Sequence, residues 1–215
     1  MRPELKRRDC NRLALGLLLS GISPLATHAT DKHTLLVVGD SLSAEYGIAR
    51  GSGWVALMAA ELAKEKPQYQ VVNASISGET TAGGLARLPN LLQQHQPKCV
   101  VIELGGNDAL RGFSLQSTES NLVQMVTACQ KARAKVLLVG MQVPPNYGAG
   151  YAQAFSDLFV RISKQYKTQL VPFLLKGVAD AKDPTALFQA DRIHPNAQAH
   201  PLILSNVWPV LKKML

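Results

Sequence analysis

The chain has 215 residues, of which 47 % are hydrophobic, and this size and composition fit one globular domain with a sizeable core. The formal net charge is +8 at pH 7, but +3 of it falls within residues 1–29, which hold five basic and two acidic side chains. The other basic residues are dispersed, whereas a nucleic-acid-binding surface needs them clustered. Composition therefore argues against a nucleic-acid partner and leaves, at most, peripheral contact with lipid.

Residues 1–29 are patterned as a secretory signal peptide. Basic residues come first, an apolar run follows from Leu13 to Ala26, and Thr27 and Ala29 place small residues where a signal peptidase reads them. The run is too short to cross roughly 30 Å of hydrocarbon as a helix, which argues against an uncleaved membrane anchor. We therefore expect a signal peptide at 1–29, a single domain at 30–215 and a periplasmic or secreted protein.

Two cysteines remain after residue 29. Cys99 opens an apolar run and Cys129 lies on an apolar helix face, so we expect both thiols to be buried. An oxidising compartment would permit a disulfide, but the sequence does not show whether the two are close. No Cys-x-x-Cys and no histidine pair with metal-ligand spacing occurs, so we expect no metal and no cofactor.

Short apolar runs predict five strands, at Thr34–Val38, Val71–Ala74, Cys99–Leu104, Val136–Val139 and Leu170–Phe173. They do not alternate with polar residues, which is typical of parallel strands buried on both faces. Apolar stripes within residues 54–62, 122–129 and 151–162 predict helices between the strands. This alternation predicts a three-layer α/β/α domain with right-handed crossovers. A last helix is expected from Pro201, kinked or interrupted at Pro209.

Gly-rich polar loops follow the first three predicted strands. They read GDSLS at 39–43, SISGE at 75–79 and GGND at 105–108. In open α/β sheets, ligands bind beyond the carboxyl ends of the strands. These loops are therefore the expected place for chemistry, whatever that chemistry is.

Ser41 is a candidate nucleophile, and His194 is its candidate base. A serine hydroxyl becomes a good nucleophile only when a neighbouring base takes its proton. Asp191, three residues before His194, can accept the ring's Nδ1 proton and leave Nε2 free for the serine. Taken singly, Ser41 could be a turn residue and His194 a surface histidine. The other histidines of this part of the chain lack such a partner and are expected at the surface: His33, His95 and His200.

Gly78 and Asn107 are candidate donors to a developing oxyanion, because they stand in the loops after the second and third strands. The alternatives are a positive-φ turn for Gly78 and a turn or cap for Asn107. Four such features at one edge of one sheet favour acyl transfer. The Gly-x-Ser-x-Gly elbow, the Walker motif and Gly-x-Gly-x-x-Gly are all absent from the sequence.

These blocks, in this order, resemble the four conserved blocks of the SGNH (GDSL) hydrolases: GDSLS at 39–43, Gly78, GGND at 105–108 and Asp191-x-x-His194-Pro195. The segments SAEYGI at 43–48, LRGF at 110–113 and PNYG at 145–148 are similar to its bacterial thioesterase I/protease I/lysophospholipase and arylesterase group. The resemblance covers residues 34–211. One position departs from it, because Arg192 stands where the family commonly has glycine.

The resemblance implies a flavodoxin-like sheet of five parallel strands in the order 2-1-3-4-5. It implies a triad of Ser41, Asp191 and His194, with an oxyanion hole formed by the Ser41 and Gly78 N–H groups and the Asn107 side chain. It also implies a monomer without cofactors. The expected reaction is hydrolysis of acyl esters and thioesters, including acyl-CoA-type thioesters, aryl esters and lysophospholipids, through an acyl-serine.

Substrate choice is less constrained by the sequence. Leu110, Phe113, Tyr147 and Tyr151 follow strands at the reactive edge and are candidates to line an acyl groove, although Tyr151 could simply anchor a helix. We favour medium to long acyl chains and aryl esters. The alternatives are a carbohydrate acetylesterase of the same fold and a non-catalytic flavodoxin-like module that binds an anion at its glycine-rich loops.

Overall fold

The structure is a computed structural model that describes residues 32–183 and 185–215, and these residues pack as one compact unit. The signal peptide predicted at 1–29 lies outside the described residues. Within the described ranges, no helix is both long and apolar enough to cross a membrane.

Five parallel strands form the central sheet: β1 (His33–Gly39), β2 (Tyr69–Asn73), β3 (Cys99–Glu103), β4 (Lys135–Val139) and β5 (Gln169–Val171). Their order is β2-β1-β3-β4-β5, which confirms the predicted topology. Every residue of β3 is buried, which explains why this central strand is apolar from Cys99 to Ile102. The edge strand β2 is only partly buried.

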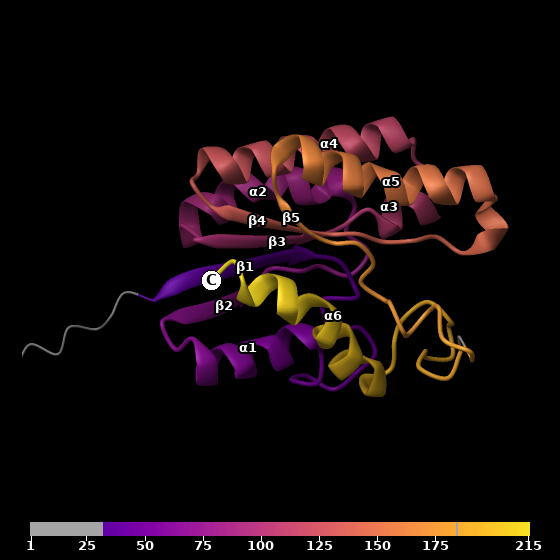
Figure 1. Cartoon of the computed structure of the whole chain (residues 1–215), viewed down its shortest axis with the longest axis horizontal. Helices are drawn as coiled ribbons and strands as arrows, with labels where there is room; N and C mark the ends of the chain where they lie inside the picture. The colour runs from indigo at the N-terminus through magenta and orange to yellow at the C-terminus, as the bar shows by residue number, and fades with distance from the viewer. Residues whose placement is uncertain (1–31, 184) are drawn as a thin grey trace, which may run out of the picture. The chain divides into compact units, whose positions relative to one another are not determined.

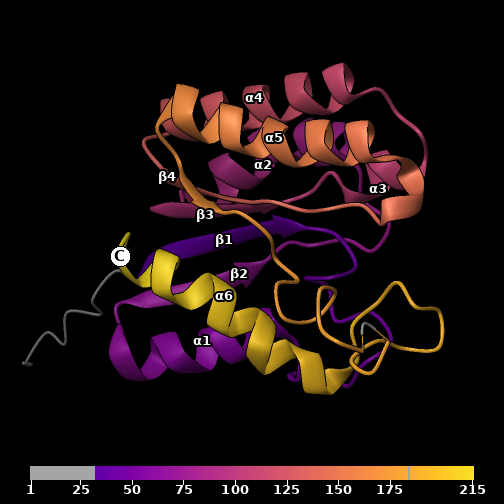
Figure 2. The same cartoon turned by 45° about the vertical axis from the view of Figure 1, so that its right-hand side comes forward.

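Helices cover both faces of the sheet (Figure 1). On one face lie α1 (Trp54–Glu65) and α6 (His200–Lys212); on the other lie α2 (Thr81–His95), α4 (Leu115–Lys131) and α5 (Ala149–Tyr166). The short helix α3 (Gly106–Leu110) follows β3 directly, and single 3₁₀ turns occur at Pro145–Tyr147 and Ala197–Ala199. The three-layer α/β/α architecture is therefore confirmed, and Figure 2 shows the two helical layers on either side of the sheet.

Helix α2 is a long helix that the apolar pattern of the sequence does not predict. Glycines 83 and 84 and Pro89 mask its periodicity, although Leu88 and Leu92 are buried at helical spacing. The Thr80 side chain begins the helix by accepting a hydrogen bond from the Gly83 N–H. A Cβ at Gly84 would lie 2.4 Å from Leu104 Cδ1, so glycine is what lets α2 approach the end of β3 closely.

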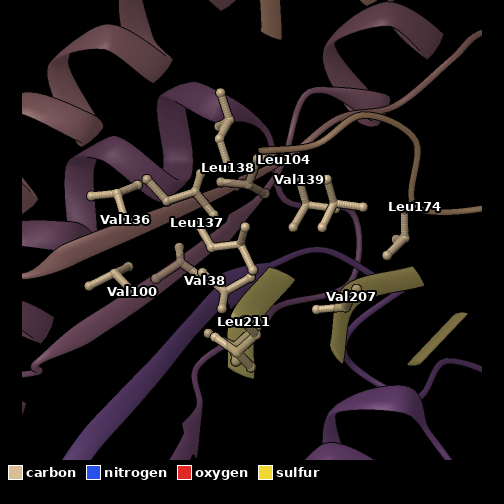
Figure 3. Close-up of a cluster of buried hydrophobic side chains, with 14 of the residues drawn as sticks. Val38, Val100, Leu104, Val136, Leu137, Leu138, Val139, Leu174, Val207 and Leu211 are labelled. Atoms are coloured by element: carbon tan, nitrogen blue, oxygen red, sulfur yellow. The ribbon is translucent and has the colours of Figure 1, made fainter. Parts of the chain in front are cut away.

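The core is continuous across the sheet. Figure 3 shows Val38, Val100 and Leu137 of neighbouring strands gathered with Val207 and Leu211 of α6. The predicted interruption of this last helix at Pro209 is wrong, because α6 continues to Lys212. Val207 and Leu211 are fully buried on either side of Pro209, so packing holds the helical path despite the missing N–H.

Both described cysteines are buried, as predicted, and both are free thiols. Burial raises the pKa of Cys99 and of Cys129 to about 12. Neither side chain is therefore a thiolate near neutral pH, and neither is a rival nucleophile to a serine.

The carboxyl ends of β1 and β2 continue side by side into their loops. The Ala74 N–H donates to the Val37 carbonyl, and the Ile76 N–H donates to the Gly39 carbonyl at 3.0 Å. These bonds bring the loop that carries Gly78 against the turn that carries Ser41. Backbone hydrogen bonds alone thus bring together the loops at the carboxyl edge of the sheet, where the sequence predicted the site.

Candidate active site

Ser41 sits in a tight turn directly after β1, and His194 reaches it from a loop near the end of the chain. His194 Nε2 lies 2.9 Å from Ser41 Oγ, and His194 Nδ1 lies 2.7 Å from Asp191 Oδ2. A histidine in this position can take the serine proton while the carboxylate stabilises the imidazolium that forms. The structure therefore brings together the three residues that the sequence singled out as a triad.

Asp191 is held as a carboxylate by its own loop. Its Oδ1 accepts from the N–H groups of His194 at 3.0 Å and Ile193 at 2.9 Å. The His194 backbone bond, then the His194 ring and the Ile193 N–H, lower the pKa of Asp191 to about 2. It stays charged across the neutral range, as an acceptor for His194 Nδ1–H must.

Arg192 closes this loop in the left-handed region, with φ of +58°. Its N–H donates to the Gln189 carbonyl at 3.0 Å, which turns the chain so that His194 follows Asp191 at bonding distance. A left-handed conformation favours glycine, since other L-residues place Cβ against the backbone. This is a physical reason for glycine at the position, and Arg192 occupies it with strain.

The two backbone donors predicted for an oxyanion hole are free. Within the part of the chain that the structure describes, neither the Ser41 N–H nor the Gly78 N–H donates to another backbone group. Gly78 has φ of +78°, a conformation that suits glycine. The Arg111 guanidinium donates to the Gly78 carbonyl at 2.9 Å and so fixes the orientation of this loop.

Asn107 is anchored on one side by the nucleophile turn. Its Nδ2 donates to Asp40 Oδ2 at 2.9 Å, and the second hydrogen of the amide remains for another acceptor. The next residue, Asp108, is buried and accepts from the Thr81 N–H at 2.9 Å and from the Thr81 hydroxyl. Helix α3 is thereby tied to the turn that carries Ser41 and to the start of α2.

Two buried carboxyl groups lie beneath Ser41. Asp40 is 2 % exposed, and burial raises its pKa to about 6 against the opposing bonds from the Leu42 N–H and Asn107. Glu103 is fully buried, and burial together with the nearby Asp40 charge raises its pKa well above the ordinary value. Glu103 was predicted only as part of a strand and not as a functional residue. The pattern that could have indicated it is a single ionisable residue within an otherwise apolar run.

The ring of Tyr46, in the loop after the turn that carries Ser41, lies against the ring of His194. The two ring centroids are 4.3 Å apart. Gln189 Nε2 bonds the Tyr46 carbonyl at 2.8 Å, and Glu45 Oε1 accepts from the N–H groups of Gly51 and Gly53. These bonds fix residues 45–53 against the His194 loop.

The four candidate acyl-groove residues differ in exposure. Leu110 and Phe113 are 50 % and 43 % exposed, whereas Tyr147 and Tyr151 are half-buried. The rings of Tyr147 and Tyr151 stack at 6.1 Å, and Tyr151 stacks on buried Phe155 at 6.3 Å. Leu110 and Phe113 are thus free to meet a ligand, while Tyr151 lies between the core and the surface and anchors α5.

The expectation that His200 lies at the surface is wrong. It is 3 % exposed, and its Nδ1 accepts from the Trp54 N–H at 3.0 Å, so it caps the start of α1 in place of a side chain from α1's own N-cap. Burial lowers the pKa of His200, which keeps it a neutral acceptor. Sequence spacing could not show this, because the two residues are 146 positions apart.

Within the described residues, neither the pocket outside this site nor any metal-binding cluster offers an alternative. A surface hollow of about 310 Å³ lies at the opposite, amino-terminal edge of the sheet, lined by Leu92, Gln96, Pro97, Lys98, Ala132 and Arg133, and it holds no nucleophile with a base. Among residues 32–183 and 185–215, no three His, Cys, Asp or Glu side chains are grouped to hold a metal ion.

A serine–histidine–aspartate relay at the carboxyl edge of a parallel α/β sheet is the arrangement of a serine hydrolase. The chain belongs to the GDSL-like lipase/acylhydrolase family, whose model matches residues 37–202. This confirms the resemblance seen in the sequence blocks, and the chain is a hydrolytic enzyme of that family.

Several relatives cover more than four fifths of the chain. Esterase TesA of Pseudomonas aeruginosa is 52 % identical over 93 % of this chain and 98 % of its own. Thioesterase 1/protease 1/lysophospholipase L1 of Escherichia coli strain K12 is 44 % identical over 83 % of each chain. A crystal structure of TesA has a TM-score of 0.81 at 53 % identity, over 85 % of this chain and 100 % of that one. A Pseudoalteromonas esterase, EstA, was solved inhibited by monoethylphosphonate, with a TM-score of 0.78 at 41 % identity, over 85 % and 98 %.

Proposed function

We propose that this protein hydrolyses acyl esters and thioesters through an acyl-enzyme formed on Ser41. One observation carries the proposal: Ser41 Oγ, His194 and Asp191 form a continuous relay with contacts of 2.9 and 2.7 Å. Each heteroatom is at the distance that proton transfer in acyl transfer requires. The names of the relatives, which are esterase, thioesterase and arylesterase, support the same chemistry.

The reaction proceeds in two halves. His194 Nε2 takes the Ser41 proton as Oγ attacks the acyl carbon, and the oxyanion accepts from the Ser41 and Gly78 N–H groups and from Asn107. The tetrahedral intermediate collapses, and the imidazolium protonates the departing alkoxide, phenolate or thiolate. Water then enters, gives a proton to His194 and attacks the acyl carbon. As this second tetrahedral intermediate collapses, the imidazolium returns the proton to Ser41 Oγ, which releases the carboxylic acid and regenerates the free serine.

For substrates, we propose medium to long acyl chains and aryl esters, with acyl-CoA-type thioesters and lysophospholipids among them. Leu110 and Phe113 support this, because each is large, apolar and at least 43 % exposed beside the reactive edge. Buried apolar contact with an acyl chain contributes about 0.8 kcal/mol per CH₂. Tyr147 and Tyr151 contribute a second wall at most, since they stack on each other.

We also propose a cleaved leader at 1–29, a periplasmic or secreted location and a monomer. The basic-then-apolar pattern of that leader supports the location. Mass measurement of the protein from the periplasmic fraction tests it: the proposal expects a chain that begins at Thr30, and an intact Met1 would contradict it.

Hydrolysis of p-nitrophenyl esters from acetate to palmitate tests the activity. Ser41→Ala is the control, because it removes the nucleophile and nothing else. The proposal expects kcat/KM to rise beyond acetate and to vanish in Ser41→Ala. A sharp preference for acetate would favour a carbohydrate acetylesterase, and turnover that survives Ser41→Ala would exclude this mechanism.

A further inference from the structure

Glu103 ends β3 as a fully buried carboxyl directly beneath the nucleophile turn. Its Oε2 accepts from the Ser43 hydroxyl at 2.7 Å and faces the Asp40 N–H at 3.4 Å. Its Oε1 is buried and has no hydrogen-bond partner among the described residues. Burying a carboxyl is costly unless hydrogen bonds offset the cost, so the contacts that Glu103 makes within the site are what account for its place there.

The neighbouring strand leaves room for this carboxyl. Gly39 of β1 is the register partner of Glu103 in β3. A Cβ at Gly39 would lie 2.9 Å from Glu103 Oε2 and 2.8 Å from Ser43 Oγ, which are distances that real Cβ contacts essentially never show. The glycine at the end of β1 is therefore needed for the bond between Glu103 and Ser43.

A short chain of contacts leads from Glu103 to the reacting atoms. The Asp40 N–H points to Glu103 Oε2. The two carboxylate oxygens of Asp40 accept hydrogen bonds, Oδ1 from the Leu42 N–H at 3.0 Å and Oδ2 from the Asn107 amide at 2.9 Å. Ser41 lies between the two backbone positions that these bonds hold. Movement of this turn would displace the nucleophile, its N–H and the Asn107 amide together.

We propose that Glu103 is a positioning residue for the nucleophile and the oxyanion hole: through Ser43 and the Asp40 N–H it fixes the turn of residues 39–43. This inference rests on the proposed function, and it assigns to Glu103 no contact with substrate. Burial, and then the adjacent Asp40 charge, raise the pKa of Glu103. The ionisable groups around Asp40 itself are Glu103, His194 and Asp108.

Two substitutions at Glu103 separate positioning from charge. Glu103→Gln keeps the size and one acceptor oxygen for Ser43 without a charge, and Glu103→Leu keeps only the volume. Misplacement of a catalytic group by 1 Å costs about 10²-fold, so we expect Glu103→Leu to lower kcat about 10–100-fold with little change in KM. Glu103→Gln should keep kcat within about threefold, because the acceptor remains.

Thr34→Val is the matched control. Thr34 is also buried and polar, and it lies at the other end of β1, where its Oγ1 accepts from Gln70 at 3.2 Å. Active sites are counted by titration with an organophosphonate, so that kcat refers to folded enzyme alone. We expect Thr34→Val to change thermal stability and leave kcat per site unaltered.

A Glu103→Leu enzyme with wild-type kcat per titrated site would overturn the inference, and so would Glu103→Gln falling as low as Glu103→Leu. If Glu103→Leu does not fold, Ser43→Ala removes the same contact from the turn side. It should then lower kcat about tenfold, and an unchanged kcat would overturn the inference. Absence of ester turnover in the unmodified protein is a different result, since it contradicts the proposed function itself.

Discussion

The side-chain amide of Asn107 donates to Asp40 Oδ2 at 2.9 Å, which ties the loop after β3 to the turn that carries Ser41. This bond uses one amide hydrogen and aims the group, leaving the other hydrogen for a developing oxyanion. The candidate nucleophile and one candidate oxyanion donor are thus parts of a single bonded unit. The predictions below follow from this arrangement and from the strain and burial around it.

Removing the Asn107 amide should slow the chemical step. Asn107→Ala is expected to lower kcat by about 10²–10³, or ~3–4 kcal/mol, because one preorganised donor to the oxyanion is lost. Steady-state kinetics with p-nitrophenyl esters measures this, and KM should change little. An Asn107→Ala enzyme with full kcat would remove Asn107 from the mechanism.

Asp40→Asn should impair the same step without touching substrate. Both carboxylate oxygens of Asp40 accept hydrogen bonds, from Leu42 and from Asn107, and an asparagine offers only one oxygen. We expect kcat to fall about tenfold or more, with a smaller combined loss in Asp40→Asn/Asn107→Ala than the two single losses multiplied. Independent, multiplicative losses would show that Asp40 does not act through Asn107.

Glu103 should make the fold less stable as the pH rises. Its folded-state pKa lies above its ordinary value of 4.5, so above pH 4.5 the unfolded chain loses this proton while the native state keeps it. Unfolding free energy then falls by about 1.4 kcal/mol per pH unit until the folded pKa is reached. Glu103→Gln removes this term, and urea titrations from pH 4 to 8 should show its advantage over the wild type growing with pH. An advantage independent of pH would contradict a raised pKa.

Arg192→Gly should stabilise the protein. A left-handed residue other than glycine costs about 1–2 kcal/mol, and glycine returns about 0.5–1 kcal/mol of this as extra entropy of the unfolded chain. The net gain of about 0.5–1 kcal/mol corresponds to a Tm increase of about 1–4 °C for a domain of this size. Arg192→Ala keeps the left-handed strain and serves as the control. A glycine variant no more stable than the alanine variant would rule out strain at this position.

The strands were predictable from the sequence because burial on both faces requires consecutive apolar residues. β1 and β4 contain unbroken apolar runs, and β3 is apolar up to Glu103; the parallel direction of the strands follows from the helices between them. Helix α2 was not predicted, since Gly83, Gly84 and Pro89 interrupt its amphipathic pattern, although Gly84 is what allows close packing on Leu104. Helix α6 likewise continues beyond Pro209 because its buried face packs against the core, and the sequence alone does not show this packing.

The triad was predictable because Asp191 and His194 are close in the sequence and the loops after parallel strands meet at one edge. The supporting contacts were not, since they join distant residues through side-chain geometry. Glu103 with Ser43, Asp108 with Thr81 and Arg111 with Gly78 are separated by 60, 27 and 33 positions. His200 was misplaced at the surface for the same reason.

The most direct test of the account is covalent labelling by an organophosphonate that mimics an acyl ester, followed by mass measurement of the labelled peptide. The account predicts one phosphonyl group per chain, attached to Ser41, with the rate of labelling reduced by His194→Ala and labelling absent in Ser41→Ala. A phosphonyl group on any other residue, or labelling that persists in Ser41→Ala, would contradict Ser41 as the nucleophile.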